Sequence, residues 1–240
     1  MNQNLDFGFI WDTGLLLLER LPTTLLISFV PMICGTLLAI GIALVRIYRI
    51  PVINQMCILY VSFIRGTPTI VQLLLVFYGL PWATQALVGL VNPSWAFDFN
   101  KMPAETFAIV ALTIATSAYS SELLRSAIES VDRGQLEAAE SIGLRPWQVM
   151  VKIVFPQAAL NALPNLGNTL LGLIKDSSLA FTVSVVDIMG MAKIVGARSL
   201  RFLECYFAVS IIYWIVCIVV ELVVKLAERR LSVSRRSLAQ

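Results

Sequence analysis

The residues best suited to chemistry gather around a Lys-Asp-Ser-Ser run in the last third of the chain. Amides, hydroxyls and an ammonium group donate hydrogen bonds to a carboxylate. We expect this role for Asn165, Asn168, Lys175, Ser177 and Ser178. A carboxylate accepts hydrogen bonds from an ammonium group, and Asp176 or Glu122 is the candidate for that role. These residue types predict reversible binding of a small polar molecule.

The patterns of a catalytic chain are missing from the sequence. It contains no histidine, no G-x-S-x-G elbow, no cluster of metal-ligating residues, and neither a GxxxxGK[ST] nor a GxGxxG phosphate-binding loop. Its four cysteines, Cys34, Cys57, Cys205 and Cys217, have no CxxC spacing, so we interpret them as packing residues. The chain is therefore expected to be non-catalytic and to carry no cofactor of its own.

The amino-acid composition predicts an integral membrane protein. Of its 240 residues, 58% are hydrophobic and 14% are charged, and the mean hydropathy is +0.81. Globular chains average roughly 45–50% apolar and about 25% charged residues. The first 20 residues lack a basic region followed by a signal-type apolar run, so we expect insertion through the first membrane helix.

Five apolar segments approach the roughly 20 residues that a helix needs to cross a bilayer. We expect crossings at Leu21–Val45, Met56–Leu80, Ala104–Leu124, Leu160–Ile174 and Cys205–Val224. The intervening segments and the C-terminal tail place eleven Lys and Arg residues on one side of the membrane and six on the other, with Arg65 inside the second crossing. The positive-inside rule then predicts an extracytoplasmic N-terminus and a cytoplasmic C-terminus.

The second and fourth segments differ from the other three because they contain helix breakers and polar residues. We expect a broken helix at Arg65-Gly66-Thr67-Pro68, with Arg65 in a structural contact at the cytoplasmic interface rather than on a ligand. The fourth segment, also expected to be interrupted, has Asn, Pro and Gly residues that a lipid-facing helix would not tolerate, which favours a pathway lining. The alternatives are close helix packing for these residues and a solvated ion pair for Lys175 and Asp176.

The longest expected cytoplasmic segment, Asp132–Gln157, predicts two short helices. Gly143 suits the left-handed residue that ends the first helix, and Pro146 suits the first turn of the second. An apolar stripe on the first helix, formed by Leu136, Ala138, Ala139 and Ile142, must be buried against some surface. That surface is either this chain's own crossings or a soluble partner.

The segment carries a specific motif: Glu137-Ala138-Ala139, three residues, Gly143, nine residues, Ile153, and Pro156 three positions further. It resembles the EAA motif of binding-protein-dependent ABC importer permeases, departing only at Phe155, where Leu is usual. The resemblance to the polar amino acid branch extends over essentially the whole chain. It includes Arg65-Gly66-Thr67-Pro68, Tyr78-Gly79-Leu80-Pro81, Ala118-Tyr119, Glu122 with Arg125, and the run from Lys175 to Leu179.

The resemblance implies a single all-α permease domain over residues 1–240, with five transmembrane helices of the methionine-importer-like fold and a coupling loop at residues 132–157. It implies a bacterial plasma membrane protein that works with a second permease chain, a cytoplasmic ATPase dimer that binds ATP and Mg²⁺, and an extracytoplasmic amino-acid-binding protein. By the same resemblance, Glu137, Ala138, Ala139 and Gly143 dock on the ATPase, and Pro156 supports them.

Other functions remain open from the sequence. A secondary amino acid transporter would need coupling-ion sites and usually internal repeats, and no repeat is evident. A channel lacks a selectivity signature, and a membrane scaffold recruiting a cytoplasmic partner would leave the polar fourth segment unexplained. The substrate is not readable: the chain looks most like cystine-type permeases, but glutamine, arginine and histidine importers share its motifs. A homodimer and a heterodimer of permeases are equally compatible with it.

Overall fold

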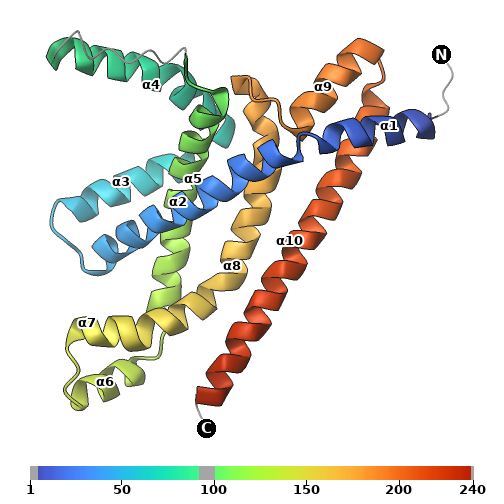
Figure 1. Ribbon diagram of the computed structural model, residues 1–240. Helices are drawn as coiled ribbons and strands as arrows, with labels where there is room; N and C mark the ends of the chain where they lie inside the picture. The colour runs from blue at the N-terminus through green and yellow to red at the C-terminus, as the bar shows by residue number, and fades with distance from the viewer. Residues whose placement is uncertain (1–4, 92–100, 239–240) are drawn as a thin grey trace.

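The computed structural model describes residues 5–91 and 101–238, and within these two ranges every regular element is helical (Figure 1). The elements are α1 (Phe7–Leu18), α2 (Leu21–Ile47), α3 (Ile53–Gly66), α4 (Thr69–Val91), α5 (Ala104–Glu129), α6 (Arg133–Ser141), α7 (Pro146–Val149), a π-helical segment η3 (Met150–Val154), α8 (Phe155–Asp176), a 3₁₀ segment η4 (Ser177–Val183), α9 (Ile188–Ser199) and α10 (Phe202–Leu238).

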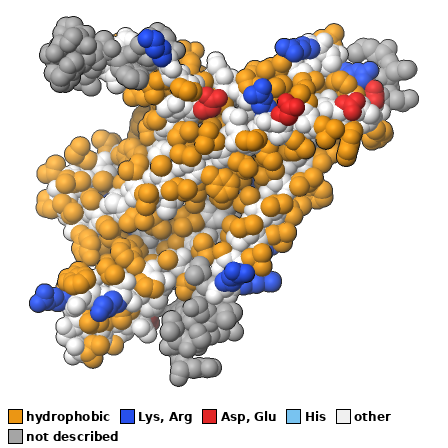
Figure 2. Space-filling view, in the orientation of Figure 1, with side chains coloured by type: hydrophobic (Ala, Val, Ile, Leu, Met, Phe, Trp, Pro, Cys, Tyr) orange, Lys and Arg blue, Asp and Glu red, His pale blue; other side chains and the backbone are white. Residues whose placement is uncertain are grey.

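The first, third and fifth predicted membrane crossings are confirmed, whereas the second and fourth have different bounds. Among the described residues, four segments are long and apolar enough to cross a membrane: Leu21–Ile47, Thr69–Ala86, Ala104–Glu129 and Phe202–Arg230. A fifth span exists if the pair Pro146–Val183 and Ile188–Ser199, bent by 52°, counts as one. Figure 2 shows a broad apolar band with the charged side chains gathered toward its two ends, as a bilayer requires.

The predicted break in the second crossing is confirmed. Helix α3 ends at Gly66, Thr67 is extended before Pro68, and α4 begins at Thr69. The buried side chain of Gln72 donates to the carbonyls of Ile64 (2.7 Å) and Thr67 (3.0 Å) at the end of α3, where the Ile64 carbonyl also accepts from the Thr67 amide at 3.4 Å. The predicted crossing Met56–Leu80 is thus two helices.

The fourth crossing is not interrupted where we expected. Helix α8 continues through Pro164, Gly167 and Gly172, and the break comes later, after η4, between Val183 and Ile188. Packing explains this continuity, because a Cβ on Gly167 would lie 2.6 Å from the side chain of Val224 on α10. The close approach to α10 supports the helix where its own sequence is weak.

The centre of the molecule is α5, which packs on α2, α4 and α8. Small residues bring the helices together: a Cβ on Gly35 of α2 would lie 2.6 Å from the Thr116 side chain of α5. The core around them contains Ile27, Leu73, Ala108, Ala111 and Leu112. A rigid α2–α5 unit results.

Two helices were absent from our expectations. Helix α1 is capped by Asp6, whose carboxylate accepts from the Phe9 amide at 3.0 Å, and it lies beside α9 and α10 (Figure 1). Helix α9 is capped by Asp187. Both are 12 residues long, too short to cross a bilayer, so a search for crossings passes over them.

Candidate functional site

A pocket of about 260 Å³ lies where the start of α4, the middle of α5 and the end of α8 meet. It is lined by Thr69, Leu112, Ala115, Thr116, Tyr119, Thr169, Gly172, Leu173 and Asp176. Three threonines, a tyrosine and one carboxylate on otherwise apolar walls match the chemistry of a small polar ligand.

One face of α8 carries the polar residues that the sequence singled out. Asn165, Thr169, Gly172 and Asp176 follow one another at spacings of four, three and four residues, so they share a face. Asn168 and Lys175 border that face, and both are exposed together with Asn165. The predicted donors Asn165, Asn168 and Lys175 therefore lead toward the pocket, and Asp176 lies inside it.

Arg65 lies beside the pocket, where its side chain contacts the pocket-lining residue Tyr119. Its guanidinium carbon lies 5.8 Å from the centroid of the Tyr119 ring, within cation–π distance. Arg65 occupies the last turn of α3, where the helix dipole favours a cation. This is a structural contact made to a residue that lines the pocket, and the expected position of Arg65 at the cytoplasmic interface stays a prediction.

Three other predicted pathway residues have different surroundings. Ser177 is fully buried and faces Asp187 and Tyr213, so it is not available as a pathway donor. The hydroxyl of Ser178 donates to the carbonyl of Lys175 at 2.7 Å. Glu122 lies outside the pocket, where it pairs with Arg46 and Arg125.

The reason for these corrections is geometric. Successive helical residues point about 100° apart, so Ser177 faces the core when Asp176 faces the pocket. Glu122 follows Tyr119 by almost one turn along α5, and the cations of α2 and α5 hold it there. A run of polar residues in the sequence does not form one polar surface.

The segment 132–157 has the predicted two-helix form. The Asp132 carboxylate caps α6 by accepting from the Gly134 amide at 2.7 Å. Gly143 has φ +82°, the left-handed conformation that favours glycine, and Leu144 donates back to the carbonyl of Ala139 at 3.2 Å. Pro146 starts α7. These caps make the segment a defined body rather than a loose loop.

The apolar stripe of α6 is divided between two surfaces. Ala139 is buried and Leu136 half-buried against the ends of α5 and α8, in a cluster with Ala127, Val131, Val149, Val154, Ala158 and Ala162. Ala138 is exposed together with Glu137, and Ile142 is 78% exposed. Trp147 on α7 is 59% exposed. One side of the stripe anchors the helix, and the other is free for a partner.

The connection to the membrane helices runs through η3. This π-helical segment joins α7 to α8, where Pro156 occupies the first turn and is exposed. Segments of π-helix occur often at functional positions. The candidate coupling residues and the candidate pathway therefore lie at opposite ends of one continuous helical stretch, formed by α7, η3 and α8.

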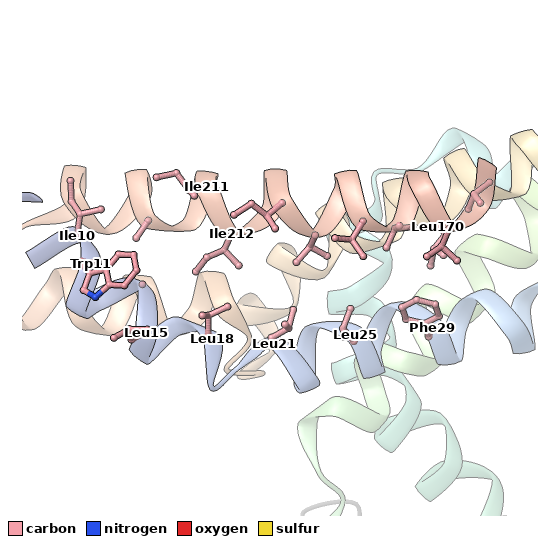
Figure 3. A pocket seen from close by; sticks show the side chains of 18 of the residues that line it. Ile10, Trp11, Leu15, Leu18, Leu21, Leu25, Phe29, Leu170, Ile211 and Ile212 are labelled. Atoms are coloured by element: carbon pink, nitrogen blue, oxygen red, sulfur yellow. The ribbon is translucent and has the colours of Figure 1, made fainter. Parts of the chain in front are cut away.

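A second, larger hollow has a different character. This groove of about 880 Å³ runs between α1, α2 and α10 (Figure 3). Its walls include Trp11, Leu18, Leu25, Phe29 and Ile212, and the residues that line it are apolar. Such a surface suits hydrocarbon, so we do not assign the polar ligand to it.

Sequence reasoning missed several residues of the site. Thr69, Thr116 and Thr169 were not singled out, and Tyr119 was quoted only as part of a motif. The available signal was polar residues three or four positions apart in apolar crossings, as Thr116 and Tyr119 are in α5. Their meeting with α4 and α8 depends on the tertiary structure.

Comparison with known proteins identifies the family. Residues 35–233 match the family described as binding-protein-dependent transport system inner membrane component. The L-cystine transport system permease protein TcyL of Bacillus subtilis is 40% identical over 231 residues, covering 96% of this chain and 93% of TcyL. The probable amino-acid permease protein YxeN of the same organism is 38% identical over 228 residues, covering 95% and 96%.

Solved structures show the same architecture. A chain of an amino acid ABC transporter crystallised with histidines is 32% identical and superposes with a TM-score of 0.80, over 95% of this chain and all of that one. A chain of the inward-facing MetNI methionine ABC transporter shares the fold at 17% identity, with a TM-score of 0.71 over 94% of this chain and 99% of that one. The chain therefore belongs to the binding-protein-dependent transport system inner membrane components, and within them to the amino-acid ABC transporter permease subunits.

Proposed function

We propose that this permease subunit moves a polar amino acid along the face of α8 that ends at Asp176, driven by an ATPase docked at α6. The observation that carries the proposal is the continuity of α8. It is one helix of 22 residues from the coupling segment to the pocket, about 33 Å at 1.5 Å per residue. A displacement of α6 and α7 is thus transmitted directly to the pocket.

The pocket offers complementary groups to an amino acid zwitterion. Asp176 accepts from the ammonium group, and the donors along α8, Asn165, Asn168 and Lys175, attract the carboxylate. Thr69, Thr116 and Thr169 add hydroxyl groups to the pocket wall. The hydroxyls of Thr116 and Thr169 donate to carbonyls of their own helices, so they can offer the ligand only acceptor lone pairs. We expect the binding affinity of this site to be low, because few charged groups converge on it. Low affinity suits a transport pathway, since the pathway must release the ligand that it binds.

The coupling surface comprises Glu137, Ala138, Gly143 and the exposed Ile142 and Trp147. Ala139, buried against α5 and α8, supports this surface instead of docking as we expected, and the exposed Pro156 supports it from the first turn of α8. The ATPase binds ATP and Mg²⁺, and its closure pushes α6 as a rigid body because α6 is capped and anchored on α5 and α8. The pathway then opens alternately to the two sides of the membrane.

The proposed assembly has this chain, residues 1–240, as one permease domain in the bacterial plasma membrane. A second permease chain completes the pathway, and a cytoplasmic ATPase dimer and an extracytoplasmic amino-acid-binding protein cover its two ends. The N-terminus faces outward and the C-terminus inward, because the positively charged segments around α6 and the end of α10 belong on the cytoplasmic side. L-cystine is the first substrate to test, given the name of the relative TcyL.

The decisive experiment measures ATP hydrolysis by the assembled complex in proteoliposomes, with binding protein loaded with L-cystine or another polar amino acid. The Gly143→Pro variant is compared with the native chain, because proline cannot adopt φ +82°. We expect stimulation by loaded binding protein in the native complex and none in the variant, with assembly preserved. Transport by the native chain without any ATPase would instead identify a secondary carrier.

A second experiment addresses the pathway. The double variant Asn165→Leu, Asn168→Leu removes two exposed amides from α8. We expect uptake to fall about tenfold, the effect of a transport barrier raised by roughly 1.4 kcal/mol. The control is Gln55, an exposed amide in the first turn of α3, changed to Leu. Unchanged uptake at normal membrane levels of the double variant would contradict the proposed pathway.

A further inference from the structure

Asp187 has an unusual environment for a carboxylate. It is fully buried at the start of α9. Its Oδ1 accepts from the Gly190 amide at 2.8 Å, and its Oδ2 accepts from the Tyr213 hydroxyl of α10 at 3.0 Å. The Ser177 hydroxyl lies 3.5 Å from the same Oδ2. The carboxylate is thus surrounded by neutral donors from three elements.

Capping alone does not account for this residue. Ser or Thr caps a helix nearly as well as Asp, and neither brings a charge into the interior. Burying a carboxylate is costly unless hydrogen bonds compensate it. What Asp187 adds over a Ser cap is its second oxygen, which binds Tyr213 and reaches Ser177. The function of the residue therefore concerns those two partners.

Ser177 is the residue at which α8 changes into the 3₁₀ segment η4. Its hydroxyl donates to the Ile174 carbonyl at 2.8 Å and lies 3.3 Å from the Tyr213 hydroxyl. A 3₁₀ segment has poorer hydrogen-bond geometry than an α-helix, so the rotation of the chain at this junction is weakly specified by the backbone. The Asp187–Tyr213–Ser177 contacts specify it instead.

The neighbouring elements hold this polar cluster in place. A Cβ on Gly190 would lie 2.7 Å from the Phe181 ring, so η4 and α9 approach closely there. The amide of Ile188 donates to the Thr24 hydroxyl of α2 at 3.3 Å. The cluster is consequently fixed to α2, α9 and α10 at once, while Asp176, adjacent to Ser177, lines the pocket.

We propose that Asp187 is a positioning residue: through Tyr213 and Ser177 it fixes the rotation of the last turn of α8 and keeps Asp176 facing the pocket. Its relevance to transport rests on the proposed pathway, but the orientation itself is measurable without substrate. Removing the Tyr213 hydroxyl frees the junction, and Asp176 then samples orientations away from the pocket.

The test is the rate at which a water-soluble thiol reagent labels Asp176→Cys in a chain whose four native cysteines are replaced. Thr169→Cys, two turns earlier on the same face, reports general access to the pocket. In the Tyr213→Phe and Asp187→Asn backgrounds we expect the ratio of the Asp176→Cys labelling rate to the Thr169→Cys labelling rate to fall about tenfold. This is the effect expected from the loss of one hydrogen bond to a charged group. Tyr206→Phe, on the exposed side of α10, should leave it unchanged.

An unchanged ratio of labelling rates in both backgrounds would overturn the proposal, provided that thermal unfolding shows the variants to be folded. Tyr213→Phe deletes a single oxygen atom, so it gives an answer even if Asp187→Asn does not fold. Uptake by Asp176→Asn separates this inference from the proposed function. Normal uptake by Asp176→Asn together with a lowered labelling ratio in the Tyr213→Phe background would refute the proposed pathway and retain the positioning role of Asp187. Lost uptake by Asp176→Asn together with an unchanged labelling ratio would support the pathway and refute the positioning role.

Discussion

Arg46 on α2 forms an ion pair with Glu122 on α5, although 76 positions separate them in the chain. Glu122 also pairs with Arg125 at 3.0 Å, and Arg125 pairs with Glu129 at 2.7 Å. The alternating charges lie at the end of α5 that leads into α6. These ion pairs connect α2 to α5, the helix that leads into α6. We therefore expect the coupling segment to move together with α2 and α5.

We expect Glu122→Gln to destabilise the protein by about 2 kcal/mol, because two guanidinium groups lose a partly buried partner. The measurement is the midpoint of thermal unfolding in detergent. Glu221→Gln is the matched control, since it removes an exposed pair within one turn of α10 and should leave the midpoint unchanged. Equal midpoints for the two variants would show that the α2–α5 pair contributes nothing.

Two glycines of α2 should respond oppositely to the same substitution. Gly35→Ala places a methyl group 2.6 Å from the Thr116 side chain and should cost about 2 kcal/mol through separation of α2 from α5. Gly41 has open space around it, so Gly41→Ala should be neutral or slightly stabilising. Thermal unfolding of both variants checks this, and a similar loss in both would exclude close packing as the cause.

Adjacent alanines of α6 should separate docking from folding. Ala139→Glu brings a charge into the cluster between α6, α5 and α8 and should destabilise the chain by about 3 kcal/mol or more. Ala138→Glu lies on the exposed side and should leave the unfolding midpoint unchanged while weakening co-purification of the ATPase. Retained ATPase binding in a stable Ala138→Glu variant would move the docking surface elsewhere.

The N-terminal helix should be attached in a pH-dependent way. The pKa of Asp6 lies below its ordinary value of 3.8, first because of the Phe9 amide and then because of Arg201, which contacts it at 2.7 Å. A lowered pKa means that the attachment is complete above pH 3.8 and is lost as pH falls through the folded value. Thermal unfolding of Asp6→Asn should therefore differ from native at pH 7, and the difference should vanish in acid. A difference independent of pH would assign the effect to the cap alone.

The coupling motif was readable from the sequence because its chemistry is local. A capping Asp132, a left-handed Gly143 and a first-turn Pro146 act on their own neighbours, so spacing alone specified both short helices. The break before Pro68 is local in the same sense. The crossings followed from length and hydropathy, since a bilayer imposes both on each segment separately.

The direction of individual side chains depended on contacts between distant segments. Pro164 and Gly167 indicated a break in α8, but the close approach of Val224 from α10 keeps the helix continuous. Glu122 was a candidate for binding an ammonium group until Arg46, brought from α2, became its partner. Ser177 and Asp176 are neighbours in sequence, yet Tyr213 and Asp187 draw one into the core while the other faces the pocket. Sequence specifies what a segment can form; packing against the rest of the chain decides which way its residues point.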